Sequence, residues 1–132
     1  MLVPDNHPLA AYASVTPEAI RDHRLLITSK TCPYRNKLEM LLQETGIMPV
    51  ETMEIGSMGA LQYYVQKGMG IALMPKAGLN PPPQGTTVLE MGSSSIHMSC
   101  GLLCKASEYP LKQAGARLYQ FMKSELTDNR LL

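Results

Sequence analysis

The sequence lacks the features that mark membrane, secreted and nucleic-acid-binding proteins. No apolar run approaches the roughly 20 residues that a membrane-spanning helix needs, so we expect no membrane partner. The opening segment MLVPDNHPLA has neither the basic nor the apolar region of a signal peptide. Twelve Lys and Arg residues stand against eleven Asp and Glu residues, and the net charge of +1 predicts no electrostatic surface for DNA on this chain.

Paired cysteines are also lacking. Cys32, Cys100 and Cys104 are an odd set without a C-x-x-C motif, and the last two fall in an apolar run that we interpret as a strand. Two residues four apart on one face of a strand lie roughly 13 Å apart, which is too far for a disulfide. Free thiols indicate a reducing compartment, and we therefore expect a cytoplasmic protein.

Short apolar runs alternate with helical patterns along the 132 residues, which are enough for one domain with its own core. Pro17 and Pro33 stand where helices begin, and Gly46 and Gly68 stand where helices end. Their order predicts an α/β fold with parallel strands and right-handed crossovers. We expect strands at 25–28, 50–55, 71–74, 87–91 and 96–105, and helices at 17–22, 33–45, 58–67 and 107–126.

Polar or helix-capping residues follow three of the predicted strands, at 28–31, 56–57 and 75–76. In such sheets, ligands bind outside the carboxyl ends of the strands. The first two of these segments place hydroxyl and backbone N–H groups at the start of a helix, where the helix dipole favours an anion. Ordinary helix capping explains each segment equally well, so an anion site and simple capping both stay open at this point.

Enzymatic and metal-binding functions find little support. Cys32 could act as a nucleophile, but His7, His23 and His97 do not follow a predicted core strand where a base would meet it. No two Cys or His residues have the spacing of metal ligands. The glycines at 68–70 precede a strand, whereas a dinucleotide fingerprint follows one, so a helix end and a tight strand entry explain them. We expect no enzyme, metal or cofactor.

Four segments together resemble the effector-binding domain of LysR-type transcriptional regulators. Their order and spacing follow that family over nearly the whole chain. The resemblance implies a periplasmic-binding-protein type 2-like, Rossmann-like fold, with a parallel or mixed sheet and flanking helices in each of two α/β subdomains. A small effector would lie in the cleft between the subdomains. The segments are HPLA at 7–10, LLITSKTCPYRNKLEMLLQETGI at 25–47, EIGSMGALQYYVQKGMGIALMP at 54–75 and GLLCKASEYPLKQAGARLYQFM at 101–122.

The resemblance also implies how the chain is divided. Residues 1–132 would be a partial effector-binding domain, with the second α/β subdomain at 12–96. Residues 1–11 and 97–132 would be crossover strands and the remnant of the first subdomain. Family members form homodimers or homotetramers and bind DNA through a helix-turn-helix domain, which is absent from this sequence. This chain by itself is therefore expected to bind no specific DNA.

Carried over by position, the family's effector contacts form a defined set on the two helix-start loops. A small carboxylate-bearing effector would bind there, close the subdomains and change the arrangement of DNA-bound oligomers. Arg35, Pro75 and Lys76 are possible additional contacts. The principal contacts are Ser29, Lys30, Thr31, Cys32, Gly56 and Ser57.

Two alternatives remain beside the regulator interpretation. One is a stand-alone solute-binding protein of the same fold, which the missing signal peptide and the free thiols disfavour. The other is a thiol-based redox sensor that acts through Cys32. Peroxide-sensing relatives place a reactive cysteine at this position and its partner nine residues later, where this sequence has Leu41. The resemblance therefore does not carry their disulfide switch to this chain.

Overall fold

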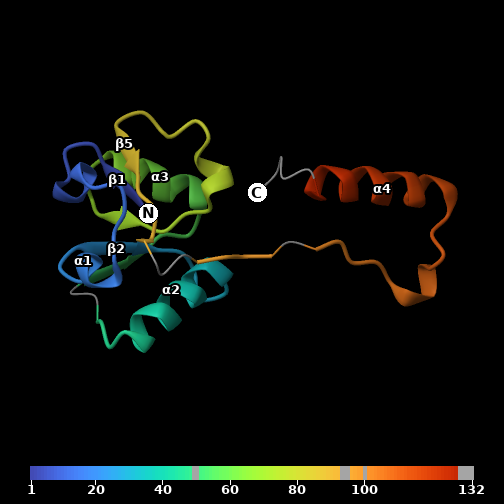
Figure 1. Cartoon of the computed structure of the whole chain (residues 1–132), viewed down its shortest axis with the longest axis horizontal. Coiled ribbons are helices and arrows are strands. Elements are labelled where there is room, and N and C mark those ends of the chain that lie inside the picture. Colours follow the sequence, from blue (N-terminus) through green and yellow to red (C-terminus); the bar gives the residue numbers. More distant parts are fainter. Residues whose placement is uncertain (49–50, 93–95, 100, 128–132) are drawn as a thin grey trace. The chain divides into compact units, whose positions relative to one another are not determined.

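The structure, a computed structural model, describes residues 1–48, 51–92, 96–99 and 101–127. The chain divides into two compact units, Met1–His97 and Met98–Leu132 (Figure 1). Within the described ranges, no helix is both long enough and apolar enough to cross a membrane.

The first unit is a five-stranded sheet with helices on both faces. The strands lie in the order β3-β2-β4-β1-β5. Strand β2 runs parallel to β3 and β4, and β1 runs antiparallel to β4 and β5. The predicted α/β fold with a mixed sheet is confirmed. Its elements are β1 Leu2–Pro4, η1 Pro8–Ala11, α1 Pro17–Ile20, β2 Arg24–Ile27, α2 Pro33–Glu44, β3 Glu51–Glu54, α3 Met58–Gln66, β4 Ile71–Ala72, η2 Lys76–Leu79 and β5 Thr86–Val88.

Local sequence signals set the ends of the two longer helices of this unit. Pro33 occupies the first turn of α2, where its missing N–H is not needed. The Ser57 hydroxyl begins α3 by accepting a hydrogen bond from the Ala60 N–H at 3.2 Å. Gly46 and Gly68 follow the helices with φ of 68° and 73°, a conformation that glycine adopts without steric cost.

The core has two halves because successive residues of a strand point to opposite faces of the sheet. Leu25 and Ile27 of β2 pack on one face, and Leu26 between them packs on the other. Helices α1 and α2 cover the first face through Ile20, Leu38 and Leu42. Helix α3 covers the opposite face through Leu61 and Val65, so the sheet lies between two helical layers (Figure 1).

Strand β1 lies inside the sheet, between β4 and β5. Leu2 and Val3 are fully buried there, because an apolar segment gains most by pairing at the centre of a sheet. The compact unit that contains this sheet is Met1–His97, and the subdomain boundaries at 12 and 96 stay a prediction.

The predicted strand at 96–105 is wrong over the residues that the structure describes. Residues 96–99 and 101–105 have no regular secondary structure, and Leu103 is 98% exposed. A strand forms only when a neighbour supplies hydrogen bonds, and no described strand pairs with this apolar run. Cys100 lies outside the described residues, so its predicted spacing from Cys104 is not described.

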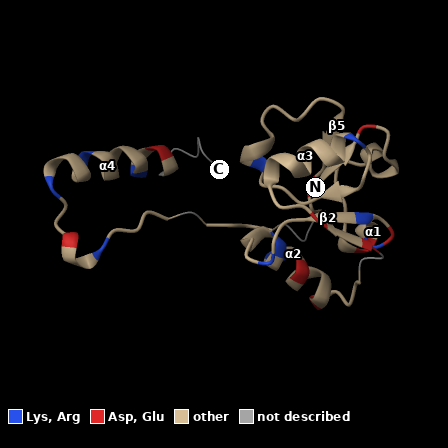
Figure 2. Cartoon of the chain, turned by 180° about the vertical axis from the view of Figure 1, so that it is seen from behind, with Lys and Arg blue, Asp and Glu red and all other residues tan. Residues whose placement is uncertain are grey.

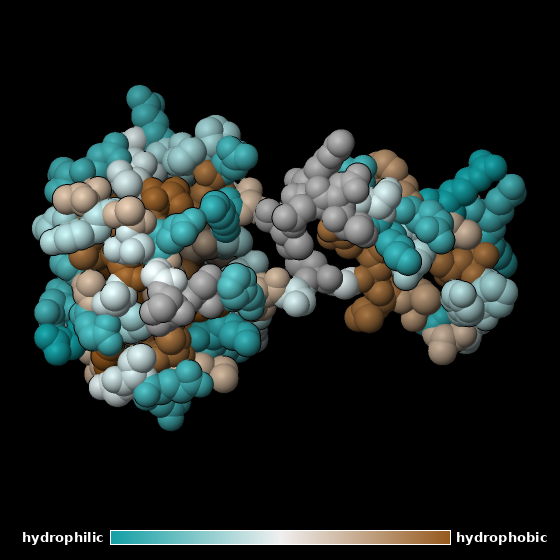
Figure 3. Space-filling view, in the orientation of Figure 1, coloured by the Kyte–Doolittle hydropathy of each residue, from teal (hydrophilic) through white to brown (hydrophobic). Residues whose placement is uncertain are grey.

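The last helix begins later than its sequence pattern predicts. Helix α4 spans Gln113–Thr127, whereas the pattern predicts a start at Ser107. A short 3₁₀ turn, η4 at Ala106–Glu108, precedes it, and Pro110 separates the two because proline disfavours helical backbone in the residue before it. The apolar side of α4 is exposed within this unit, with Leu118, Phe121 and Met122 at 60%, 63% and 42% (Figure 3).

Gly70 allows a close approach between the entry of β4 and β2. A Cβ atom at this position would lie 2.6 Å from the backbone oxygen of Arg24 and 3.1 Å from the Leu26 side chain. The contact confirms the structural interpretation of this glycine, since it explains the residue without a nucleotide.

Substitution of this glycine tests the packing of β4 on β2. Gly70→Ala is expected to lower the free energy of unfolding by about 1–3 kcal/mol, because the added methyl group meets backbone. The matched control is Gly59→Ala in α3, where no atom lies within 4 Å of the new Cβ; it is expected to leave stability unchanged or raise it by up to about 1 kcal/mol. Urea denaturation measures both, and equal effects would contradict the close approach.

Candidate functional site

The segments that follow β2, β3 and β4 lie along one edge of the sheet because these strands are parallel. Ile27 at the end of β2 pairs with Glu54 at the end of β3. One further backbone bond continues this ladder, from the Ile55 N–H to the Ile27 oxygen at 2.7 Å. The loop that starts α2 and the loop that starts α3 therefore leave the sheet side by side.

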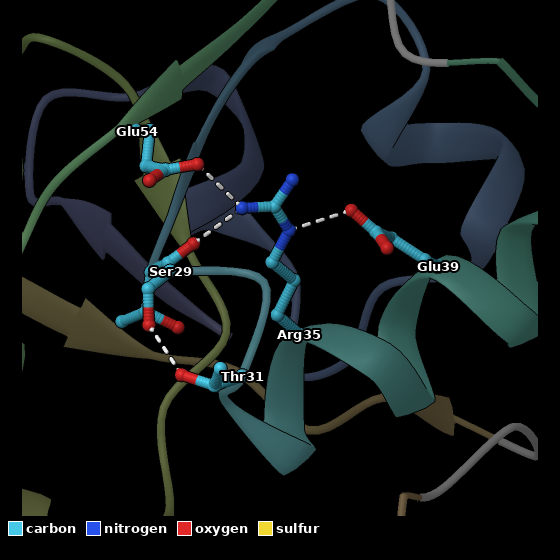
Figure 4. A network of polar contacts seen from close by, with 6 residues as sticks. Ser29, Thr31, Arg35, Glu39 and Glu54 are labelled. Carbon is cyan, nitrogen blue, oxygen red and sulfur yellow. Dashed lines mark hydrogen bonds and ion pairs between the residues drawn. The ribbon is translucent and has the colours of Figure 1, made fainter.

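The loop before α2 is organised by its own polar groups. Ser29 Oγ and Thr31 Oγ1 lie 3.0 Å apart and share a hydrogen bond (Figure 4). The Cys32 N–H donates to the Ser29 oxygen at 3.0 Å, which closes a turn around Lys30. Two hydroxyls that share one hydrogen bond keep one proton free to donate. Lys30 is exposed and forms no ion pair with any described residue.

Cys32 is the residue before the first turn of α2, and its thiol makes no capping hydrogen bond. Burial by itself raises the pKa of the Cys32 thiol. The Thr28 hydroxyl, the N–H groups of Arg35 and Tyr34 and the Arg35 charge favour the thiolate, and together they bring the pKa below its ordinary value. This helix start therefore favours the negatively charged form of its own thiol.

The loop before α3 presents Gly56 and Ser57, both exposed. Ser57 caps the helix through its oxygen, so the capping interpretation is confirmed for this residue. The capping oxygen accepts, and the hydroxyl proton remains available to donate to a ligand. At Gly56, a Cβ atom would meet nothing within 4 Å, so close contact within the chain does not explain this glycine.

Arg35 lies in a network of acceptors instead of pointing freely to solvent (Figure 4). Its Nη1 donates to the Thr28 oxygen and to Glu54 Oε2, each at 2.7 Å, and its Nε donates to Glu39 Oε1 at 2.7 Å. The side chain is 9% exposed, and its two carboxylate partners raise the pKa of the guanidinium. The four-residue spacing of Arg35 and Glu39 on a helix predicts one of these pairs, but Glu54 becomes a partner only through the register of β3.

Pro75 and Lys76 follow β4 and begin η2. Lys76 is 82% exposed and forms an ion pair with Glu90 at 3.2 Å. An ion pair that is open to solvent in this way contributes little to stability. Lys76 is consequently partly neutralised at the surface.

A depression open to solvent lies beside the start of α2. Among the predicted site residues, Cys32 and Arg35 line it, while Ser29, Lys30, Thr31, Gly56, Ser57, Pro75 and Lys76 do not. Sequence reasoning missed its apolar wall, which forms only when the two helices and the sheet meet. The full lining is Leu26, Ile27, Thr28, Cys32, Tyr34, Arg35, Leu38, Met58 and Leu73.

The histidines lie apart from this lining. The rings of His7 and His23 meet edge to face with their centres 4.5 Å apart. Burial, followed by the charge of His23, lowers the pKa of His7. No cluster of three or more His, Cys, Asp or Glu side chains that could hold a metal ion occurs in the part of the chain that the structure describes.

Alkylation of Cys32 tests the electrostatics of the α2 start. In a chain that carries Cys100→Ser and Cys104→Ser, the pH midpoint of iodoacetamide alkylation is expected below the ordinary thiol pKa, because the thiolate is the reactive form. Thr28→Val removes one stabilising hydroxyl and is expected to move the midpoint upward. The control Thr52→Val, on β3, is expected to leave it unchanged.

The same shift has a defined sign for stability. Folding favours the Cys32 thiolate, so this group adds to the free energy of unfolding. That contribution is complete above the ordinary thiol pKa and is lost as the pH falls through the pKa of Cys32 in the folded protein. If Thr28→Val leaves the pH midpoint of Cys32 alkylation unchanged, the role assigned to the Thr28 hydroxyl is contradicted.

Sequence comparison identifies the family to which this architecture belongs. Residues 1–127 match the family described as LysR substrate binding domain. The HTH-type transcriptional regulator YtlI of Bacillus subtilis is 28% identical over 114 residues, which are 86% of this chain and 37% of that protein. The regulator GltR of the same organism is 38% identical over 58 residues, 44% of this chain and 20% of that protein.

Solved structures agree with this assignment. The effector-binding domain of QuiR in complex with shikimate is 28% identical with a TM-score of 0.62, over 70% of this chain and 44% of that one. The BenM effector-binding domain with its effector benzoate has a TM-score of 0.63 at 17% identity, over 92% and 59%. The chain thus spans less than half the length of YtlI and of the QuiR domain. It belongs to the LysR substrate-binding domain family.

Proposed function

We propose that this chain forms one wall of the effector cleft in the ligand-sensing domain of a LysR-type transcriptional regulator. The observation that carries the proposal is that two neighbouring parallel strands of a family member each lead into a helix start, at Cys32 and at Ser57. In this proposal Met1–His97 is the second subdomain, and residues 98–132 contribute to the first. Because the relatives are regulators, we favour this role over a stand-alone solute-binding protein.

The proposed ligand is a small carboxylate with an apolar body. Shikimate and benzoate, the compounds bound to QuiR and BenM, are both carboxylates. In this chain, Ser29, Thr31 and Ser57 would donate hydrogen bonds to the carboxylate. The N–H groups in the first turns of α2 and α3 would do the same, except at Pro33, which has none. Met58 and Leu73 of the depression are suited to contact an apolar ring.

Lys30 is the side chain that we assign to the charge of the ligand. Arg35 is paired with two carboxylates and Lys76 with one, whereas Lys30 forms no ion pair within the described residues. Basic and acidic residues are scattered along the ribbon instead of gathering in one segment (Figure 2). An anionic ligand would therefore be attracted by one local cation and two helix starts, without a general positive field.

The proposed regulation is a shift between two arrangements of the domain. A ligand that contacts both subdomains binds the closed arrangement more tightly and so increases its population. In a cytoplasmic homodimer or homotetramer, closure would change the placement of helix-turn-helix domains, which lie outside this sequence. No catalytic step is part of this proposal.

Titration with benzoate tests the proposed site. In amide NMR spectra of this chain, benzoate is expected to shift the signals of residues 30–35 and 56–60, while neutral benzyl alcohol is expected to leave them in place. Lys30→Met is expected to weaken benzoate binding by about twofold to fivefold and to reduce its salt dependence, as for one exposed ion pair.

Lys37→Met is the matched control, because Lys37 is also an exposed cation and lies on α2. It is expected to bind benzoate as the unmodified chain does. Shifts that gather away from both loops, or equal losses in the two variants, would contradict the proposed site.

A further inference from the structure

We propose that Arg35 is a positioning residue that ties the two helix-start loops together and does not itself bind the effector. The functional importance of this tie rests on the proposed function, because the two loops act as a pair only if both contact one ligand. Its geometry stands on three contacts of one guanidinium group, which reach three separate segments of the chain (Figure 4).

Arg35 continues the connection between β2 and β3 beyond the point where backbone pairing stops. The last backbone bond of that ladder joins the Ile55 N–H to the Ile27 oxygen. The next carbonyl after the end of β2 belongs to Thr28, and Arg35 Nη1 donates to it at 2.7 Å. The same nitrogen donates to Glu54, the last residue of β3, also at 2.7 Å. The loop of Ser29 and the loop of Ser57 therefore leave the sheet from a single fixed junction.

The charges around Arg35 argue against a direct role in binding an anion. Both hydrogens of Nη1 and the hydrogen of Nε are already donated, two of them to carboxylates. Two negative partners more than balance one guanidinium charge, so an approaching carboxylate would meet repulsion from Glu39 and Glu54. The 9% exposure of the side chain leaves little of it accessible to a ligand.

The two carboxylates have different roles in this network, and this difference makes the proposal testable. Glu39 lies one turn away on α2, so its ion pair joins residues of a single helix. Glu54 belongs to β3, so its ion pair joins that strand to α2 across 19 positions of sequence. Both pairs are 2.7 Å long, and their acids are exposed to a similar extent, at 52% and 55%.

Amide hydrogen exchange in Glu54→Gln and Glu39→Gln, a matched pair of variants, decides between positioning and general stabilisation. The probes are the Cys32 and Ile55 amides, which donate to Ser29 and Ile27 at the junction. In Glu54→Gln, both are expected to exchange about tenfold faster, as for the loss of a charge-assisted hydrogen bond. The exchange rates of the β4 and β5 amides are expected to stay unchanged in Glu54→Gln. In Glu39→Gln, the exchange rate of the Ile55 amide is also expected to stay unchanged.

Arg35→Lys separates charge from geometry. A single ammonium group keeps the charge but cannot hold the Thr28 carbonyl and both carboxylates as the planar guanidinium does. The Cys32 and Ile55 amides of Arg35→Lys are therefore expected to exchange as fast as those of Glu54→Gln. The proposal is overturned if Arg35→Lys exchanges like the unmodified chain, or if Glu54→Gln and Glu39→Gln give the same pattern.

A binding measurement keeps this inference distinct from the proposed function. Glu54→Gln and Glu39→Gln each remove one negative charge next to Arg35, so Glu54→Gln is expected to bind benzoate more weakly than Glu39→Gln only because it loosens the junction. Failure of benzoate to bind the unmodified chain would count against the proposed ligand class, while the exchange experiment, which contains no ligand, would still decide the role of Arg35.

Discussion

The parallel pairing of Arg24–Ile27 with a neighbour on each side is the constraint on which the rest of this structure depends. Leu25, Leu26 and Ile27 are apolar and buried on alternating faces, so a one-residue slip would exchange the two halves of the core. With this register in place, three strands end at one edge of the sheet. Two helix starts, at Cys32 and Ser57, then follow neighbouring strands at this edge, and we propose that they give a chain with almost no net charge a local preference for an anion.

The cations Arg35 and Lys76 at this edge are held in ion pairs and do not form a positively charged cluster. Arg35 is held by Glu39, Glu54 and the Thr28 carbonyl, and Lys76 faces Glu90. In the proposed site, fixed N–H and hydroxyl groups would carry most of the recognition and would need no reorganisation when a ligand arrives. Such an edge suits a small carboxylate better than a polyanion, since the described residues offer one unpaired cation there, Lys30.

Sequence patterns predicted the parts of the fold that depend on neighbouring residues. Pro33, Ser57 and the glycines at 46 and 68 marked the ends of α2 and α3 because capping acts within a single turn. Patterns failed where distant segments decide the outcome. The apolar run at 96–105 suggested a strand, but no described strand pairs with it, and the place of β1 between β4 and β5 follows from pairing with segments about 70 to 85 residues away. In the candidate site, the sequence alone pointed to the hydroxyl and thiol residues of the two loops. The contact between Glu54 and Arg35 depends on the register of β3 and could not be predicted from the sequence.

The central claim is that the two helix starts form one wall of a carboxylate site. A crystal structure of the complete effector-binding domain that contains this segment, with a bound carboxylate, tests it most directly. The account predicts carboxylate oxygens within hydrogen-bond distance of the loops at 29–32 and 56–57, and an Arg35 that keeps its contacts with Thr28 and Glu54. A ligand held by the Arg35 guanidinium, or bound away from both loops, would contradict the account.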